Sequence, residues 1–410
     1  MSWQPGQSQL SATSALSGFR LAVVVSHPTQ YYSPWFRWIA AHCPIDLRVF
    51  YLWDFGITPQ RDPRFGTTFS WDVDLVSGYA WEQVPNRSKH PGTERFSGLD
   101  NPSLWARLKP WRPDAILLFG YAYRSHLSLV ARARLAGIPL VFRGDSHLLG
   151  REQRGFGKRL LLGLLYRQFA ALTYVGKANR TYFRTFGIPP GRLFFAPHAV
   201  NAAHFDPCDP ATCATADAVR SSLGISREDR VILFAGKLHP DKDPMGLLEA
   251  FLTHAGPNRV LVFAGDGKDA DALRRRTAQA PGARVHFLPF ANQSEMPGRY
   301  LTGDVFCLPS RGLYETWGLA VNEAMHMGRP CIVSNLVGCQ QDLVEEGATG
   351  WVFPAGDRDA LGATLERAFA ADLSVFSRRA RERVADYSYA SAADGLLKAL
   401  KSLHRRGTGP

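Results

Sequence analysis

Short apolar runs alternate with helix-length stretches along most of the chain. In the first half, runs of strand length cover residues 20–25, 46–51, 113–119, 138–142, 172–175 and 192–196. In the second half they cover residues 231–235, 260–264, 285–288, 305–308, 331–333 and 351–353. Continuous apolar runs are typical of parallel strands that are buried on both faces. Their alternation with helices predicts an α/β protein with parallel, Rossmann-like sheets.

The length of 410 residues indicates two domains rather than one. We expect a disordered leader at 1–18, a first domain at 19–205, a linker at 206–226, a second domain at 227–385, and a final helix with its tail at 386–410. Pro, Ala, Asp and Thr dominate the start of the linker, and a short helix at 218–223 is expected to follow them.

The formal charge is +12, which suits phosphate-rich ligands, nucleic acid or an anionic membrane surface. The basic residues of the first half that cluster along the chain are Arg143, Arg151, Arg154, Lys158, Arg159, Arg167, Lys177, Arg180 and Arg184. A solvated surface and a membrane-facing surface explain this cluster equally well. Residues 157–172 form an amphipathic helix, for which core packing is the simpler interpretation and membrane contact the alternative.

Several classes of protein and site fit the sequence poorly. No apolar run is long enough to span a bilayer, and the leader lacks the order of a secretory signal. We therefore expect a cytoplasmic protein, with peripheral contact at the inner face of the membrane as an option. The six cysteines show no disulfide framework, no nucleic-acid module is visible, and no metal site is expected.

The segment 308–328 carries the strongest chemical signal. Glu315 and Glu323 lie eight residues apart, after a strand-length run and around a helix that begins near Gly318. The free N–H groups at this helix start, those of Gly318, Leu319 and the next residue, form an anion site. Such a site suits a sugar nucleotide, with its diphosphate at the helix start and its hydroxyls on the two glutamates. The alternative is a buried helix flanked by two solvated glutamates.

This segment resembles the Glu-x7-Glu motif of glycosyltransferase family 4, and the likeness continues through residues 330–334, 337–338, 342–347 and 349–353. The resemblance implies the GT-B fold, with two Rossmann-like domains facing each other across a cleft. The first domain would bind the acceptor and the second the nucleotide sugar, while the final helix would pack back on the first domain.

The implied reaction is retaining transfer of a sugar from a nucleotide diphosphate sugar, with UDP or GDP as the carrier. The acceptor would be a hydroxyl of a glycan or lipid-linked glycan, in cell-envelope or exopolysaccharide synthesis. In the course implied for this family, a donor phosphate oxygen helps to take the acceptor proton. Neither a cofactor nor a metal is implied.

The resemblance also assigns residues to roles in the second domain. Residues 235–244 resemble the family's Gly-Arg-Leu…Lys signature, with Lys237 in place of arginine, and Lys237 and Lys242 would stabilise the leaving diphosphate. Glu315 would position the sugar and Glu323 the ribose. The expected donor-binding residues are Gly236, Gly265, Leu288, Phe290, Thr316, Trp317, Gly318, Leu319 and Glu323.

In the first domain the likeness is looser. Many family members have a histidine after the strand that corresponds to 138–142, and here Arg143 or Gly144 stands in that place. Asp145 and His147 follow within a few residues and are candidate catalytic residues, with loop capping as the alternative.

The expected acceptor-binding residues are His27, Gln30, Tyr31 and Trp71. The first three follow the first strand, where the family's glycine pair is missing, and a capping loop without a ligand is the alternative. Trp71 belongs to an irregular, aromatic-rich segment at 53–101, which local packing would also explain.

Two other functions remain compatible with the fold. A nucleotide-sugar epimerase can share GT-B architecture, although it would need its own acid and base. A non-catalytic, basic, membrane-associated scaffold would use the arginine cluster and no sugar nucleotide.

Overall fold

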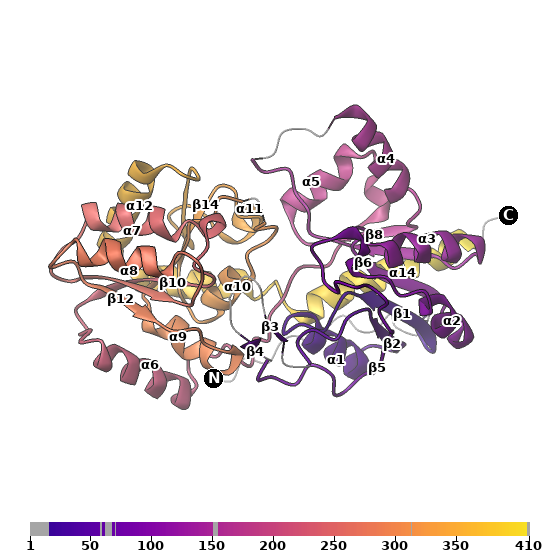
Figure 1. Ribbon diagram of the computed structural model, residues 1–410, viewed down its shortest axis with the longest axis horizontal. Helices are drawn as coiled ribbons and strands as arrows, with labels where there is room; N and C mark the ends of the chain where they lie inside the picture. The colour runs from indigo at the N-terminus through magenta and orange to yellow at the C-terminus, as the bar shows by residue number, and fades with distance from the viewer. Residues whose placement is uncertain are drawn as a thin grey trace.

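The computed structural model describes residues 16–57, 60–61, 68–69, 71–150, 155–312 and 314–407. These residues form two α/β domains, each built on a parallel sheet (Figure 1). Residues 1–15 of the expected leader lie outside the described residues. Leu16, which was assigned to this leader, is 1% exposed and packs with Phe19 in the core of the first domain.

The first domain contains a seven-stranded parallel sheet in the order β5-β2-β1-β6-β7-β8-β9. Its strands are β1 (Phe19–Val25), β2 (Ile45–Tyr51), β5 (Ala80–Gln83), β6 (Ala115–Phe119), β7 (Leu140–Arg143), β8 (Ala171–Tyr174) and β9 (Leu193–Phe195). A separate two-stranded sheet pairs β3 (Gln60–Arg61) with β4 (Thr68–Phe69). The sequence analysis missed β5, because this short edge strand is largely exposed and therefore lacks an apolar run.

Helices cover both faces of this sheet, because successive strand residues point to opposite sides. Leu21 and Val23 face the core formed with α1 (Tyr32–His42) and α14 (Tyr389–Gly407). Ala22 and Val24 face the opposite core. Helices α3 (Arg124–Leu135), α4 (Phe156–Tyr166) and α5 (Lys177–Thr185) contribute to that second core. A short helix, α2 (Leu104–Leu108), precedes β6.

The second domain contains a six-stranded parallel sheet in the order β12-β11-β10-β13-β14-β15. Its strands are β10 (Arg230–Ala235), β11 (Arg259–Ala264), β12 (Val285–Leu288), β13 (Val305–Leu308), β14 (Cys331–Ser334) and β15 (Gly350–Phe353). Helices α7 (Pro244–Thr253), α8 (Ala270–Ala278) and α12 (Arg358–Ala370) pack on one face. Helices α9 (Met296–Thr302), α10 (Leu319–His326), α11 (Gln340–Leu343) and α13 (Leu373–Val384) contribute to the other. This strand order is that of the Rossmann fold.

The expected linker is mostly helical. Helix α6 (Pro210–Ser222) packs against α9, whereas the sequence analysis placed a helix only at 218–223. Asp209 caps the helix by accepting a hydrogen bond from the Thr212 amide at 2.8 Å, and Pro210 occupies the first turn. Aspartate followed by proline is a helix start signal, so the composition that was interpreted as a linker encodes an N-terminus.

After α13 the chain returns from the second domain to the first, where the final helix, α14, lies (yellow in Figure 1). It packs against α1, β8 and β9, and its Ala392, Leu396 and Leu400 are buried in the first domain's core. None of the helices in the described ranges has the length and apolar character needed to cross a membrane.

Candidate active site

The expected donor residues follow β10 and β13, which are neighbours at the centre of the second sheet. The strand order reverses between these two strands, and ligands of open α/β sheets bind beyond the carboxyl ends of strands at such a reversal. The loop after β10 carries Lys237 and Lys242, and the loop after β13 carries Glu315. The topology therefore brings together residues that lie more than seventy positions apart.

Glu315 and Lys242 form an ion pair, and Glu315 is almost completely buried. Two hydrogen bonds tie the loops of this pair together. The Ser310 hydroxyl donates to the Asp241 carbonyl at 3.0 Å, and the Arg311 amide donates to the same oxygen at 2.8 Å. These hydrogen bonds hold together the two loops that carry Glu315, the predicted sugar-positioning residue, and Lys242, the predicted diphosphate-binding residue.

Helix α10 begins where the sequence analysis placed it. Gly318 is its N-cap, with a left-handed φ of 100° that favours glycine, and Leu319 is its first residue. A Cβ atom at Gly318 would lie 2.9 Å from a methyl carbon of Val337. The first-turn N–H groups of a helix have no partner within the helix, so this end is suited to an anion.

Trp317, a predicted donor-binding residue, has its side chain at the contact between the two domains. The indole is buried, and its Nε1 donates to the Asn322 side-chain oxygen at 2.8 Å. Its ring lies 5.8 Å from the His198 ring and 5.7 Å from the Tyr387 ring. Trp317 therefore packs the second domain against the first, a role that a large apolar side chain in a loop can fill as readily as ligand binding.

Glu323 is buried and accepts hydrogen bonds only from neutral groups. The Tyr300 hydroxyl donates at 2.7 Å and the Gln293 amide at 3.3 Å, and Tyr31 also bonds to this carboxylate. Burial raises the pKa of Glu323 to about 7, although these three hydrogen bonds act in the opposite direction. Gln293 and Tyr300 were missed by the sequence analysis, because nothing in their local sequence marks them as partners of a glutamate in α10.

Tyr31 contacts a residue of the second domain. It was expected to bind the acceptor, but it reaches from the first domain to Glu323, the predicted ribose-binding residue. Gln30 hydrogen-bonds to the Tyr31 side chain. In the ligand-free structure Tyr31 therefore occupies one of the acceptor positions of Glu323 that a ribose hydroxyl would need.

Asp145 and His147 connect the first domain to the Glu315 loop. The Thr316 hydroxyl donates to Asp145 Oδ2 at 2.8 Å, and His198 Nε2 lies 3.4 Å from the same oxygen. Burial acts to raise the pKa of Asp145, but the hydrogen bonds from His198 and Thr316 and the charge interaction with His198 hold it below its ordinary value. The carboxylate is thus ionised and bound at the domain contact.

His147 is held as a neutral imidazole of one tautomer. Its Nδ1 accepts a hydrogen bond from the Leu149 amide at 3.1 Å, so its Nε2 carries the proton. Nε2 then donates to the Glu315 carbonyl at 3.2 Å. His147 contacts the backbone of the predicted catalytic loop rather than an open space, which makes it a positioning residue for Glu315.

The predicted donor-binding residues at the ends of β10, β11 and β12 lie close together through their backbone. The Gly236 amide donates to Ala264 at 2.9 Å, and the Gly265 amide donates to the Leu288 carbonyl at 3.1 Å. A Cβ atom at Gly265 would lie 2.0 Å from the Gly236 carbonyl oxygen, so only glycine allows this approach. Lys237 and Phe290, at the same strand ends, are half-buried.

The remaining acceptor candidates belong to an aromatic cluster beside the first strand. The His27 ring lies 5.4 Å from the ring of Trp53 and 5.4 Å from that of Phe55. Burial lowers the pKa of His27 to about 4, so its imidazole is neutral at physiological pH. Trp71 packs beside Gly56, where a Cβ atom would lie 3.1 Å from the indole. The structure therefore places His27 and Trp71 in one region.

Comparison with known proteins agrees with this geometry. Residues 216–391 match the family described as "Glycosyl transferases group 1", and residues 55–198 match "Glycosyl transferase 4-like domain". The chain belongs to the group 1 glycosyltransferases.

Relatives of this glycosyltransferase include two curated proteins. It is 31% identical over 213 residues to D-inositol 3-phosphate glycosyltransferase from Mycolicibacterium gilvum, an alignment covering 51% of this chain and 46% of that protein. It is 26% identical to UDP-Gal:alpha-D-GlcNAc-diphosphoundecaprenol alpha-1,3-galactosyltransferase from Escherichia coli, covering 69% of this chain and 73% of that protein. The match to the first relative therefore spans about half of its length.

Solved structures confirm the GT-B fold. Anabaena HepE, solved in complex with UDP and glucose, superimposes with a TM-score of 0.70 over 94% of this chain and 100% of its own, at 16% identity. Sucrose-phosphate synthase from Thermosynechococcus elongatus gives a TM-score of 0.68 over 95% of this chain and 100% of its own, at 19% identity.

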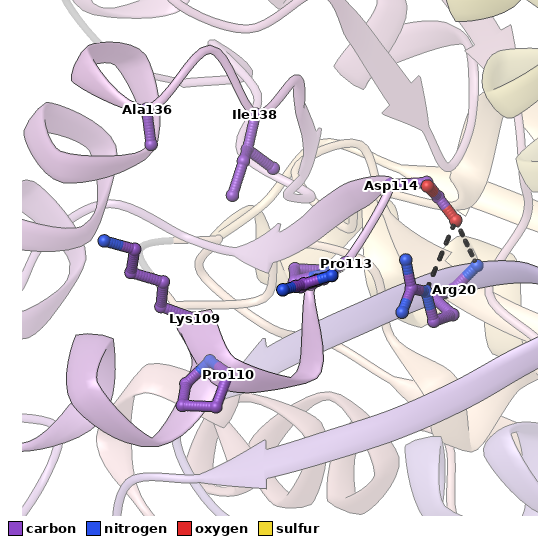
Figure 2. Close-up of a pocket in the computed structure, with 8 residues that line it drawn as sticks. Arg20, Lys109, Pro110, Pro113, Asp114, Ala136 and Ile138 are labelled. Carbon is purple, nitrogen blue, oxygen red and sulfur yellow. Dashed lines mark hydrogen bonds and ion pairs between the residues drawn. The ribbon is translucent and has the colours of Figure 1, made fainter.

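A shallow hollow in this glycosyltransferase lies at the opposite end of the first sheet (Figure 2). Arg20, Lys109 and Arg112 line it together with Asp114, whose carboxylate accepts a hydrogen bond from the Arg20 amide at 2.8 Å. Arg20 opens β1 and Asp114 precedes β6, so the hollow lies at the amino ends of the strands. Ligands of open α/β sheets bind at the carboxyl ends, and the hollow is therefore separate from the candidate site.

Metal-binding side chains do not gather in the part of the chain that the structure describes. No group of three or more His, Cys, Asp or Glu residues there is arranged to hold a metal ion. All six cysteines are free, and Cys307, Cys331 and Cys339 are buried. Activity without a metal stays a prediction.

Proposed function

We propose that this protein is a retaining family 4 glycosyltransferase that moves a sugar from a nucleotide diphosphate sugar to a hydroxyl group. The observation that carries the proposal is the joint arrangement of the Lys242–Glu315 pair, Glu323 and the α10 N-terminus at the centre of the second sheet. These groups supply a cation, two carboxylates and a helix dipole at one place. In a sugar nucleotide, the phosphates need the cation and the helix dipole. The sugar hydroxyls and the ribose hydroxyls each need one of the carboxylates.

In the proposed reaction the bond between the anomeric carbon and the donor phosphate breaks while the acceptor oxygen attacks from the same face. A donor phosphate oxygen takes the acceptor proton. Lys242, Lys237 and the first turn of α10 stabilise the charge that develops on the diphosphate. Glu315 orients the sugar, held in place by the hydrogen bonds that His147 and the neighbouring Thr316 make across the domains. No metal is required in this scheme.

UDP is the carrier that the comparisons favour, because the Escherichia coli relative is named for a UDP-linked donor. That relative is also named for a diphosphoundecaprenol-linked acceptor. We therefore propose a lipid-linked glycan as the acceptor class, in synthesis of the cell envelope or an exopolysaccharide.

The surface of helix α4 supports a peripheral membrane contact at the cytoplasmic side. Leu160, Leu161 and Leu164 are 54%, 67% and 47% exposed, which is unusual for three leucines on one helix. Lys158 and Arg159 are exposed in the same helix. Helix α4 lies at the outer edge of the first domain (Figure 1), where a bilayer with anionic lipids can reach it.

The donor assignment is tested by thermal shift and hydrolysis with UDP-, GDP-, ADP- and dTDP-sugars. We expect stabilisation by the UDP family, a smaller response in Glu323→Gln, and an unchanged response in Glu382→Gln, a control on the exposed side of α13. The activity should survive EDTA, and the anomeric proton of the product should show retained configuration by NMR. If no sugar nucleotide stabilises the wild-type protein or is hydrolysed by it, the proposed function is rejected.

The membrane contact is tested separately by co-sedimentation with vesicles. We expect binding to phosphatidylglycerol vesicles but not to phosphatidylcholine vesicles, and loss of binding when Leu160, Leu161 and Leu164 are changed to Gln. Leu135→Gln is the matched control, because Leu135 is 90% exposed on α3. Equal vesicle binding by the triple variant and the control would show that α4 does not make the membrane contact.

A further inference from the structure

A small internal cavity lies between the first domain's sheet and the start of α14. Its volume is about 10 Å³, which is close to the space that one water-sized particle requires. Trp35 from α1, Arg143 from the end of β7 and Tyr389 from the first turn of α14 all line it. Three elements that are distant in sequence therefore meet at one enclosed point.

Each of these three side chains has a buried donor atom without a partner. Trp35 Nε1, Arg143 Nε and the Tyr389 hydroxyl make no hydrogen bond to any residue that the structure describes. Trp35 and Arg143 are each only 3% exposed. Leaving a buried donor unpaired is unfavourable, and three of them around one cavity indicate a missing acceptor.

The charge of Arg143 points to the kind of acceptor. Its guanidinium donates to the carbonyls of Ala196 at 2.9 Å and Pro197 at 3.2 Å, and it lies 4.8 Å from the centre of the Trp35 ring. Asp145 is the carboxylate whose charge acts on Arg143, but it forms no direct ion pair with Arg143 among the described residues and is already bonded to His198 and Thr316. Buried charges are normally paired, so Arg143 needs a negative neighbour.

The position of α14 adds to this positive environment. Tyr389 is the first residue of this 19-residue helix, and the N-terminus of a helix carries partial positive charge. The cavity is therefore surrounded by a cation, a helix start and two neutral donors. A water molecule would have to accept hydrogen bonds from several donors and would also need acceptors for its own two hydrogen atoms. An anion only accepts hydrogen bonds.

We propose that this cavity binds one small monovalent anion of the halide class, such as chloride. The ion accepts hydrogen bonds from Trp35, Arg143 and Tyr389 and joins α1, β7 and α14. Because α14 packs on the first domain directly after the chain returns from the second, occupancy stabilises the docking of this helix. The cavity borders the candidate active site, because Tyr31, which bonds to Glu323, and His198, which bonds to Asp145, also line it. The proposal itself does not depend on the proposed reaction.

The experiment uses the full-length protein without any sugar nucleotide. Thermal unfolding is followed while chloride or bromide replaces gluconate at constant ionic strength. We expect a saturable rise in Tm with both halides. In Tyr389→Phe, which loses one hydrogen bond to a charged ligand, the half-saturating concentration should rise about tenfold. Tyr123→Phe is the control, because its hydroxyl donates to the Thr93 carbonyl far from the cavity.

Bromide also provides a direct readout, since its anomalous scattering locates it in a crystal. A peak beside Arg143 in the wild type, weaker or absent in Tyr389→Phe, would support the site. Three results would overturn it: no halide-dependent rise in Tm, an equal rise in Tyr389→Phe and wild type, or density at this point that fits only water. Trp35→Phe gives a second variant in case Tyr389→Phe does not fold.

Discussion

The two glutamates of the motif have different electrostatic environments. Glu315 is paired with the cation of Lys242, whereas Glu323 is surrounded by the neutral donors of Tyr31, Tyr300 and Gln293. An ion pair favours the ionised form, and burial among neutral groups disfavours it. The same residue type therefore lies in two environments, which suits the two different roles proposed for Glu315 and Glu323.

The raised pKa of Glu323 leads us to predict that donor binding depends on pH. Its pKa is raised from 4.5 to about 7, so the folded protein binds this proton more tightly than the unfolded chain does. Stability from this group is therefore present at acidic pH and is lost as the pH rises through about 7. Ribose hydroxyls need the carboxylate form as acceptor, so UDP affinity should fall about tenfold between about pH 8 and pH 6. Isothermal calorimetry measures this directly, and in Glu323→Gln the pH dependence should disappear.

We predict that replacing Lys242 has a large effect on catalysis. Lys242→Met removes the charge that faces Glu315 and the leaving diphosphate, while it keeps most of the side-chain volume. We expect kcat/KM to fall about 100-fold to 1,000-fold, the usual loss when one stabilising donor is removed from a transition state. Lys268→Met is the matched control, because Lys268 is exposed. Steady-state assays of both variants distinguish the two lysines, and similar activities would contradict the role of Lys242.

At the scale of elements, apolar runs predicted four neighbouring strands of the second sheet well. β12 and β13 have the predicted bounds, and β10 and β11 differ only by one residue at their start. Burial on both faces makes β10, β11 and β13 apolar nearly throughout, and this pattern is visible in a single sequence, whereas β12 is a half-buried edge strand. β5 and the first part of α6 were missed because one is exposed at a sheet edge and the other begins with residues that also form turns.

The candidate site was predictable only where its residues lie in one continuous segment. Glu315, Gly318 and Glu323 were found because they lie within one loop and helix. The contacts of Glu323 with Gln293 and Tyr300 depend on how α9 packs beside α10, which no local pattern encodes.

The loop that carries Glu315 also depends on a close backbone contact. A Cβ atom at Gly338 would lie 1.9 Å from the Thr316 carbonyl oxygen. Gly338→Ala should therefore displace this loop, lower the free energy of unfolding by about 1–3 kcal/mol and weaken UDP binding. Gly191→Ala is the control, because a Cβ atom there meets nothing within 4 Å. Urea unfolding measures both variants, and equal stability would show that the loop adapts without cost.

At the scale of the whole molecule, the second domain caps a helix of the first. The Lys177 amide, at the start of α5, donates to both carboxylate oxygens of Asp342, at 3.2 and 3.0 Å. Asp342 also accepts a hydrogen bond from the Tyr387 hydroxyl at 3.2 Å. A carboxylate at a helix N-terminus is stabilising both as a cap and through the helix dipole. This contact therefore favours the arrangement of domains seen without ligand.

Gly176 is the residue that allows this approach. A Cβ atom there would lie 2.5 Å from the Trp317 ring and 2.6 Å from Asp342 Oδ2. Neither neighbour can move freely, because the indole is buried and the carboxylate holds three hydrogen bonds. Gly176→Ala should therefore separate the two domains while leaving each domain's core intact.

Small-angle X-ray scattering of the ligand-free protein tests this separation. We expect a larger radius of gyration for Gly176→Ala than for wild type, together with weaker UDP-sugar binding, because Asp145, His147 and Tyr31 would lose their contacts with the second domain. Asp342→Ala should act in the same direction by removing the cap, with a loss of about 0.5–2 kcal/mol of stability. Gly191→Ala should match wild type in both measurements. Identical scattering from Gly176→Ala and wild type would mean that the domain arrangement does not depend on this contact, and that Asp342 serves α5 alone.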